Sequence, residues 1–184
     1  PAQLMAAASA DVPAIVLPVG PMLVGHYQGE ALGACTDCRR LWSDYRADRI
    51  GAAEIEVVNE RLAPTAGTCM VMGTASTIAC AVEALGMCLP LSATIPATHA
   101  DRIRSAEASG KTAVTLAHQG PRPSEILTAA AFRNALIVTQ SIGGSTNALI
   151  HLTAIAGRLG IRIDLGEFDE LGRKVPVLID LKPS

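Results

Sequence analysis

Apolar residues recur at helical spacing along most of the chain, and this pattern predicts several helices. Residues 75–88 (ASTIACAVEALGMC) are apolar almost all round, which is typical of a buried helix that Thr74 or Ser76 could cap. The other segments with helical spacing are residues 2–10, 36–48, 52–62, 99–118, 128–141 and 147–159. The second and third of these carry many charges and predict solvated surface helices. Thr128 could cap the fifth, and Gly160 could end the last.

Two short apolar runs predict buried β-strands, residues 14–17 (AIVL) and 177–180 (VLID). Strands that alternate with helices are typical of the α/β class. In open α/β sheets, ligands usually lie beyond the carboxyl ends of the strands. The turn at Gly20, Pro21 and Met22 follows the first predicted strand. Pro21 and Met22 are therefore candidate substrate contacts.

The composition narrows the class of protein. Hydrophobic residues make up 49% of the 184 residues and aromatic residues only 3%, so we expect one domain with an aliphatic core and room for a second small lobe. The net charge is −2 and no basic cluster exceeds two adjacent residues, which gives little support for nucleic-acid binding. The longest apolar stretch, residues 14–25, is broken by Pro18, Gly20 and Pro21 and is too short to span a membrane.

The cysteine count and the first residues bear on the location and completeness of the chain. Five cysteines, an odd number, do not suggest a secreted disulfide framework and favour a reducing cytoplasm. The chain opens on Pro1-Ala2-Gln3, with neither an initiator Met nor a signal-peptide pattern. We therefore interpret it as a piece of a longer polypeptide.

Cys69 lies in a turn between Gly67 and Gly73, directly before the apolar segment 75–88. Free cysteine is often simply a small buried hydrophobe, and taken alone the turn favours that interpretation. The alternative is a metal or cluster ligand, because a glycine-rich turn lets the backbone approach a bound group closely.

The other thiols and the histidines give weaker signals. Cys35-x-x-Cys38 could be a redox pair or half of a zinc site, but no second pair exists, and incidental thiols are the favoured interpretation. Cys80 and Cys88 fall eight residues apart on the predicted apolar helix, as core residues would. The four histidines share no metal-ligand spacing.

The segment Gly143-Gly144-Ser145-Thr146-Asn147 precedes a predicted helix. Two glycines before a serine at a helix start can aim several free backbone N–H groups at a carboxylate or phosphate. Gly144, Ser145, Thr146 and Asn147 are therefore candidate substrate contacts. The alternative is a glycine turn with a serine cap, which the pattern alone favours.

Six stretches, taken together, resemble the dihydroxy-acid/6-phosphogluconate/sugar-acid (aldonate) dehydratase family. They are PAQLMAAASADVPAI (1–15), GPMLVG (20–25), AGTCMVMGTASTIACAVEALGMCLP (66–90), FRNALIV (132–138), IGGSTNALIHLTAIAGRLG (142–160) and VPVLIDLKPS (175–184). They run in family order from end to end. The resemblance implies a three-layer α/β/α fold with a largely parallel sheet, of which this chain would be an internal part of the N-terminal domain.

The resemblance also implies a reaction, the removal of water from a 2,3-dihydroxy acid to give a 2-keto acid. An iron–sulfur cluster, with [2Fe–2S] favoured over [4Fe–4S], is held by three cysteines and assists departure of the C3 hydroxyl, while Mg²⁺ holds the substrate. Cys69 falls on the third cluster cysteine and would bind iron. The parent would be a cytoplasmic homo-oligomer, a dimer or tetramer, acting on a small hydroxy acid.

Departures from the family pattern limit what this chain could do alone. The family motif Cys-Asp-Lys-x-x-Pro-Ala starts here at Pro1-Ala2, so its cluster cysteine, magnesium aspartate and lysine would precede Pro1. The general-base serine and a further magnesium glutamate belong to a C-terminal domain that would follow Ser184. Residues 1–184 would thus be a partial N-terminal domain that lacks the C-terminal domain. We expect it to hold no cluster or magnesium and to be inactive in isolation.

The substrate and the function class have alternatives. GTCMVMGTAST resembles the sugar-acid branch more than the PGACGGMYTANT version of branched-chain amino-acid biosynthesis, so a sugar acid is favoured and a branched dihydroxy acid is the alternative. Alternatives of another class are a small redox or metal-binding module built on Cys35 and Cys38, and a non-catalytic α/β scaffold domain. For the dehydratase, we predict that the helix start at 145–147 and the loop at 20–22 face the same cavity as Cys69.

Overall fold

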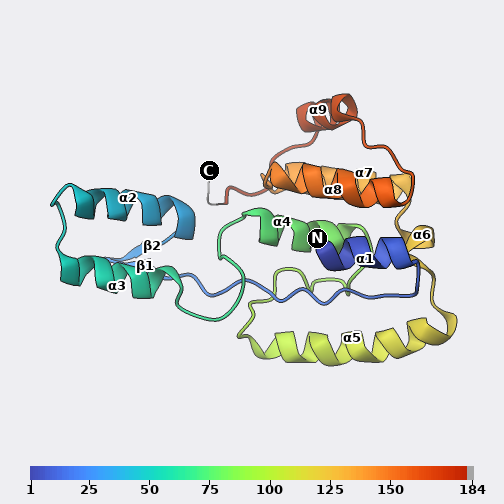
Figure 1. Ribbon diagram of the computed structural model, residues 1–184, viewed down its shortest axis with the longest axis horizontal. Helices are drawn as coiled ribbons and strands as arrows, with labels where there is room; N and C mark the ends of the chain where they lie inside the picture. Colours follow the sequence, from blue (N-terminus) through green and yellow to red (C-terminus); the bar gives the residue numbers. More distant parts are fainter. Residues whose placement is uncertain (182–184) are drawn as a thin grey trace.

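The computed structural model describes residues 1–181, and this part of the chain is mostly helical (Figure 1). Its helices are α1 (Ala2–Ala10), α2 (Ala34–Arg46), α3 (Ala52–Leu62), α4 (Thr74–Ala84), α5 (Ala100–Gln119), α6 (Pro123–Ile126), α7 (Ala129–Ser141), α8 (Asn147–Arg158) and α9 (Leu165–Lys174). Its strands are β1 (His26–Tyr27) and β2 (Glu30–Ala31). Among residues 1–181, no helix combines the length and apolar character needed to cross a bilayer.

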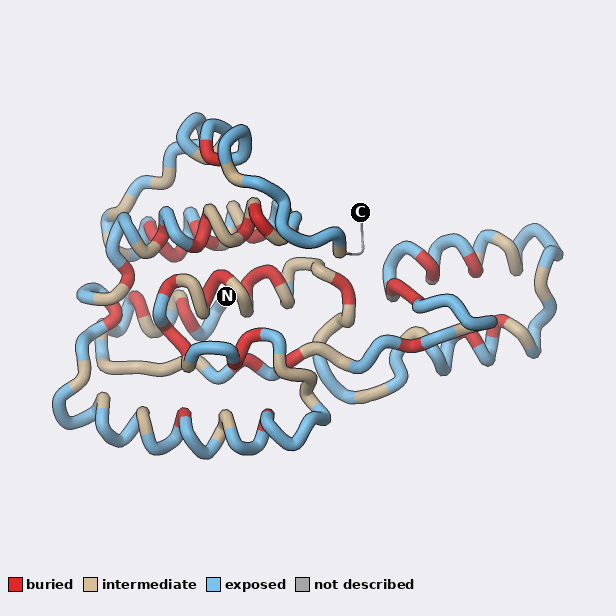
Figure 2. The backbone as a smooth tube through the Cα atoms, turned by 180° about the vertical axis from the view of Figure 1, so that it is seen from behind, coloured by how far each residue is buried: buried red, intermediate tan, exposed pale blue. Residues whose placement is uncertain are grey.

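The main core lies where α4 packs against α7 and α8, with α1 against α8 (Figure 2). Its fully buried side chains include Phe132, Leu152 and Ile155. Most of the other buried residues are Ala, Val, Leu and Ile, so the expectation of an aliphatic core is confirmed. Burial of such side chains stabilises a fold by about 1.5–3 kcal/mol each, and this core therefore supplies much of the rigidity behind the site described below.

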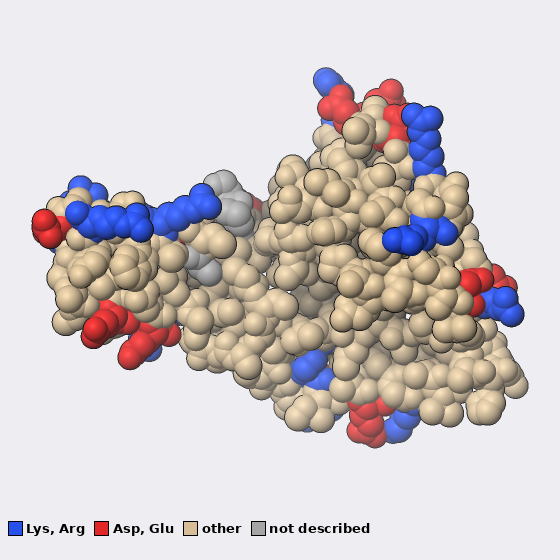
Figure 3. Space-filling model, viewed as in Figure 1, with Lys and Arg blue, Asp and Glu red and all other residues tan. Residues whose placement is uncertain are grey.

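A smaller lobe contains the only sheet formed within residues 1–181, the antiparallel hairpin β1–β2. Gln28 and Gly29 connect the strands with φ angles of 50° and 85°, as a tight hairpin turn requires. The hairpin packs with α2 and α3 over a second cluster of buried residues, Leu32, Leu41, Ile55 and Val58. Lys and Arg gather along α2 and Asp and Glu beneath α3 (Figure 3), as expected for solvated surface helices.

The prediction of strands at residues 14–17 and 177–180 is wrong for the described chain. Residues 14–17 run extended, and the Val16 N–H donates to the Met87 carbonyl at 2.7 Å, but no strand lies beside them within residues 1–181. Residues 177–180 are also irregular, with the Leu178 N–H donating to the Ser141 carbonyl at 2.8 Å. The three-layer arrangement with a parallel sheet is therefore not formed by these residues. An apolar run becomes a strand only when another backbone pairs with it.

The helix predicted over 75–88 begins at Thr74 and ends at Ala84, four residues early. Gly86 adopts a left-handed φ of 81°, which turns the chain at the helix end and leaves Cys88 outside. The start is also different from the prediction, because Gly73 occupies the N-cap position and no side chain caps it.

Other helix boundaries confirm the sequence pattern. The Thr128 hydroxyl accepts the Ala131 N–H at 3.2 Å and caps α7. Gly160, with φ 69°, follows the end of α8. Two helices were not predicted, α6 and α9. The start of α9 carries a readable signal, because Asp164 caps it by accepting the N–H groups of Gly166 and Glu167.

Candidate functional site

The turn that holds Cys69 lies directly beside the predicted ligand loop at 20–22. Thr68 and Pro21 form a parallel bridge, in which the Thr68 N–H donates to the Gly20 carbonyl at 2.9 Å. The Met22 N–H donates in turn to the Thr68 carbonyl at 2.8 Å. The structure therefore brings Pro21 and Met22 next to the residue that precedes Cys69.

Gly67 explains how the two segments come so close. Its φ is 134°, a conformation that residues with a side chain rarely adopt. A Cβ at this position would lie 2.4 Å from the Met22 nitrogen and 2.7 Å from the Pro21 carbonyl carbon. The glycine before Cys69 is therefore required by the backbone of the 20–22 loop.

The start of α4 links the Cys69 turn to the glycine segment before α8. The Ser145 N–H donates to the buried Thr77 hydroxyl at 3.0 Å, and the Asn147 side-chain amide donates to the Thr74 hydroxyl at 3.1 Å. The hydroxyls of Thr74 and Ser145 are 3.2 Å apart. On the same helix turn, the Ser76 hydroxyl donates to the Cys69 carbonyl at 3.4 Å.

The predicted contacts at 144–147 take different positions around this start. Gly144 packs on α4 and α7, since a Cβ there would lie 2.7 Å from the Thr77 methyl and 3.0 Å from the Thr139 methyl. Thr146, not Ser145, occupies the N-cap position of α8, and the Thr146 side chain makes no cap hydrogen bond. The Ser145 hydroxyl accepts the Asn147 N–H at 3.3 Å. That these residues face the same substrate cavity as Cys69 stays a prediction.

A pocket of about 480 Å³ opens beside the Cys69 turn. Its lining is mostly apolar and comes from the 20–33 segment, the turn before α4, α4 itself, Ala93 and Thr94 between α4 and α5, and the end of the described chain. Among the lining residues are Pro21, Met70, Met72, Ser76, Cys80 and Ile179. Of the substrate contacts predicted from the sequence, this pocket contains Pro21.

The cysteines do not share one environment. All five are free thiols, and Cys69 is half-buried in its turn. Burial raises the pKa of the Cys80 and Cys88 thiols, which keeps both protonated at neutral pH. Cys88 is buried, as expected for a core residue, whereas Cys80 is half-buried and lines the pocket. Cys38 lies on α2 in the other lobe.

The described residues do not complete a metal centre. Within residues 1–181, no group of three or more His, Cys, Asp and Glu side chains could hold a metal ion. An iron–sulfur cluster needs several thiolates, and residues 1–181 do not bring such a set together, so the role of Cys69 as a ligand stays a prediction.

Comparison with known proteins gives a match over the whole chain. Residues 1–184 match the family model described as dihydroxy-acid/6-phosphogluconate dehydratase N-terminal. Similar proteins include a putative dehydratase IlvD1 of Rhizobium meliloti (strain 1021) at 42% identity, a dihydroxy-acid dehydratase of Halothermothrix orenii at 41%, and an L-arabinonate dehydratase of Rhizobium leguminosarum bv. trifolii at 44%.

Each of these alignments covers the whole chain but only 32–33% of the relative, so the chain spans about a third of the length of the curated relatives it matches. The family match itself extends from the first residue to the last. The chain belongs to the dihydroxy-acid/6-phosphogluconate dehydratase family and corresponds to that family's N-terminal part.

Proposed function

We propose that the protein containing this chain is a hydro-lyase that removes water from a 2,3-dihydroxy acid and yields a 2-keto acid. The observation that carries this proposal is the position of Cys69 within a chain that matches the N-terminal domain of the dehydratase family. It lies in a turn that backbone hydrogen bonds hold against the 20–22 loop and that leads directly into α4. Such a turn presents a thiolate on a rigid support, which is what a ligand site requires.

Cys69 is proposed as one cysteine ligand of an iron–sulfur cluster, with [2Fe–2S] favoured. The other two cysteines and the Mg²⁺ ligands come, in this proposal, from parts of the protein outside residues 1–184. When bound, the metal groups supply the positive charge that a departing hydroxide needs. The contribution of this chain is to hold the thiolate and to position substrate.

Substrate positioning is proposed for the start of α8. This helix has twelve residues, and the positive end of its dipole favours an anion such as the substrate carboxylate near Ser145 and Asn147. Ser145 and Asn147 are held against α4 by Thr77 and Thr74, which limits their motion. Pro21 and Met22, which lie against Thr68, are also proposed to contact the substrate.

Two substrate classes have support. The turn motif favours a sugar acid, in keeping with the similarity to an L-arabinonate dehydratase. The apolar pocket beside Cys69 favours the alternative, a dihydroxy acid with a branched aliphatic side chain, because Met70, Met72 and Ile179 offer few partners for substrate hydroxyls.

An assay of the purified full-length protein tests this proposal. We expect 2-keto acid to form from an aldonate, and to form more slowly from a branched 2,3-dihydroxy acid. A difference of about tenfold in kcat/KM corresponds to 1.4 kcal/mol of differential binding in the transition state. The reverse preference would favour the branched substrate, and no turnover of either would contradict the hydro-lyase proposal.

The 184-residue chain by itself should be colourless, iron-free and inactive on both acids. One thiolate cannot replace the several ligands that hold a cluster, and the raised pKa of Cys80 and Cys88 argues against recruitment of these thiols. Iron and sulfide are measured after anaerobic reconstitution. Stoichiometric binding that survives Cys69→Ser would overturn both this expectation and the role of Cys69.

A further inference from the structure

The segment between α4 and α5 is irregular and is held by charged side chains from both helices. The part of it that these side chains hold is residues 89–97, which contain Leu91 in a left-handed conformation with φ 62°. The Glu83 carboxylate, on α4, accepts two backbone N–H groups from it. One oxygen accepts from Leu91 at 2.7 Å and the other from Ala93 at 2.9 Å.

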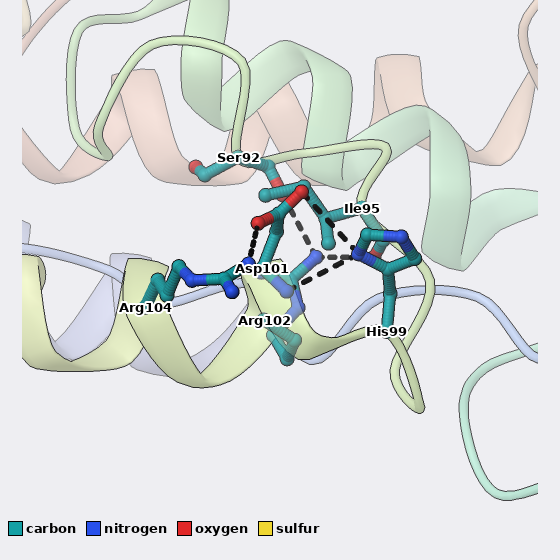
Figure 4. Close-up of polar contacts among 6 residues, drawn as sticks. All are labelled: Ser92, Ile95, His99, Asp101, Arg102 and Arg104. Atoms are coloured by element: carbon teal, nitrogen blue, oxygen red, sulfur yellow. Dashed lines mark hydrogen bonds and ion pairs between the residues drawn. The ribbon is translucent and has the colours of Figure 1, made fainter.

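Arg102, in the first turn of α5, holds the same segment through its carbonyl groups. Its Nη2 donates to the Ser92 carbonyl at 2.8 Å and to the Ile95 carbonyl (Figure 4). Arg102 is only 7% exposed, and its Nε and Nη1 have no hydrogen-bond partner among the described residues. Both side-chain hydrogen bonds of Arg102 therefore come from Nη2. Burial lowers the pKa of the guanidinium, which nevertheless stays protonated at neutral pH.

The held segment contacts the ligand loop directly. The Ala97 N–H donates to the Pro21 carbonyl at 2.9 Å. The Ile95 carbonyl oxygen lies 2.2 Å from the point where a Cβ on Gly20 would be, so only glycine fits beside it. Since Gly20 and Met22 are hydrogen-bonded to Thr68, an unbroken series of contacts leads from Arg102 and Glu83 to the residue before Cys69.

We propose that Glu83 and Arg102 are positioning residues that set the Cys69 turn through the 89–97 segment and the 20–22 loop. This inference rests on the proposed function, in which Cys69 binds iron. The two side chains act on complementary groups, since the carboxylate accepts the N–H donors and the guanidinium supplies donors to the carbonyls. Loss of Arg102 leaves the Ser92 carbonyl without its guanidinium partner, and loss of Glu83 leaves the Ala93 N–H without its carboxylate partner. Ser92 and Ala93 are buried residues, and unpaired polar groups are costly when buried.

Hydrogen exchange of the full-length holoprotein tests the inference with Arg102→Gln. We expect the amides of Met22, Thr68 and Ala97 to exchange about tenfold faster, which corresponds to the loss of about one hydrogen bond's stabilisation. The amide of Leu152, in the core of α8, should keep its rate. A role in overall stability alone would speed exchange at all four amides, and wild-type rates at the first three would overturn the proposal.

The matched control is Arg104→Gln on the same helix. The Arg104 side chain is 73% exposed and pairs with Asp101, not with the 89–97 segment (Figure 4). We expect wild-type exchange rates in this variant, and acceleration equal to that in Arg102→Gln would overturn the assignment. If Arg102→Gln does not fold, the same exchange rates are measured in Glu83→Gln. The glutamine side chain has one carbonyl oxygen and cannot accept both N–H groups that the two carboxylate oxygens of Glu83 accept. Unchanged exchange in that variant would also reject the proposal.

A second measurement separates this inference from the proposed function. The electron paramagnetic resonance spectrum of the reduced cluster should change in Arg102→Gln and stay unchanged in Arg104→Gln, since ligand geometry shapes it. An unchanged spectrum together with faster exchange would reject the effect on the cluster. If Cys69→Ser leaves the iron content at the wild-type level, the ligand role of Cys69 fails instead, whatever the exchange rates show.

Discussion

Replacement of Cys69 by serine in the full-length protein is expected to remove most of the iron and to lower dehydratase activity at least about 100-fold. A serine hydroxyl is a poor ligand for a cluster that requires thiolates, and the positive charge that assists hydroxide departure is worth several kcal/mol. Iron and sulfide content, the visible spectrum and kcat/KM measure the effect.

Two other thiols supply controls for this prediction. Cys35→Ser changes a residue on α2 in the other lobe and should leave the cluster in place. Cys80→Ser changes a half-buried thiol that lines the pocket beside the Cys69 turn, and it should also retain iron. Loss of iron in Cys35→Ser with retention in Cys69→Ser would support the alternative of a small metal or redox module.

Gly67→Ala is expected to destabilise the chain by roughly 2–4 kcal/mol, which combines the strain of the backbone conformation with overpacking. The new methyl group would meet the Met22 nitrogen at 2.4 Å, and backbone atoms cannot rotate away as a side chain can. The bridge between Pro21 and Thr68 must therefore open. Urea unfolding followed by circular dichroism gives the change in the free energy of unfolding.

Gly110→Ala is the matched control, because it is the same substitution in the middle of α5. A Cβ at this position has no atom within 4 Å, and the helix favours alanine over glycine by roughly 0.5–1 kcal/mol. This variant should be more stable than the wild type. Equal effects of the two substitutions would contradict the role assigned to the Gly67 conformation.

The helices could be predicted from the sequence wherever their signals are local. The periodic segments became α5, α7 and α8, and the cap at Thr128 and the stop at Gly160 lie where the residue types predict them. Helical hydrogen bonds join residues four apart, so a short stretch contains most of the information that they need. Gly67 does permit a close approach, but to the backbone of the 20–22 loop, and the approach of this turn to a bound group stays a prediction.

The strands and the early end of α4 depended on more distant residues. Residues 14–17 have the composition of a strand, but strand pairing requires a second backbone from elsewhere, and residues 1–181 do not place one there. Gly86 could have continued the apolar helix at a modest cost. Its left-handed conformation ends α4 instead, and residues 89–97 then turn back over α4 to the Glu83 carboxylate.

The tertiary structure alone decided which charged residues support the site. In the sequence, Arg102 and Arg104 are two similar cations in one amphipathic helix, yet Arg102 is buried against carbonyl groups and Arg104 is solvated. The sequence by itself determined most of the helices, the resemblance to the family and Cys69 as the candidate ligand. The contacts between the 20–22, 66–69 and 89–97 segments arose only from the fold, because they join backbones many residues apart and carry no local pattern of side chains.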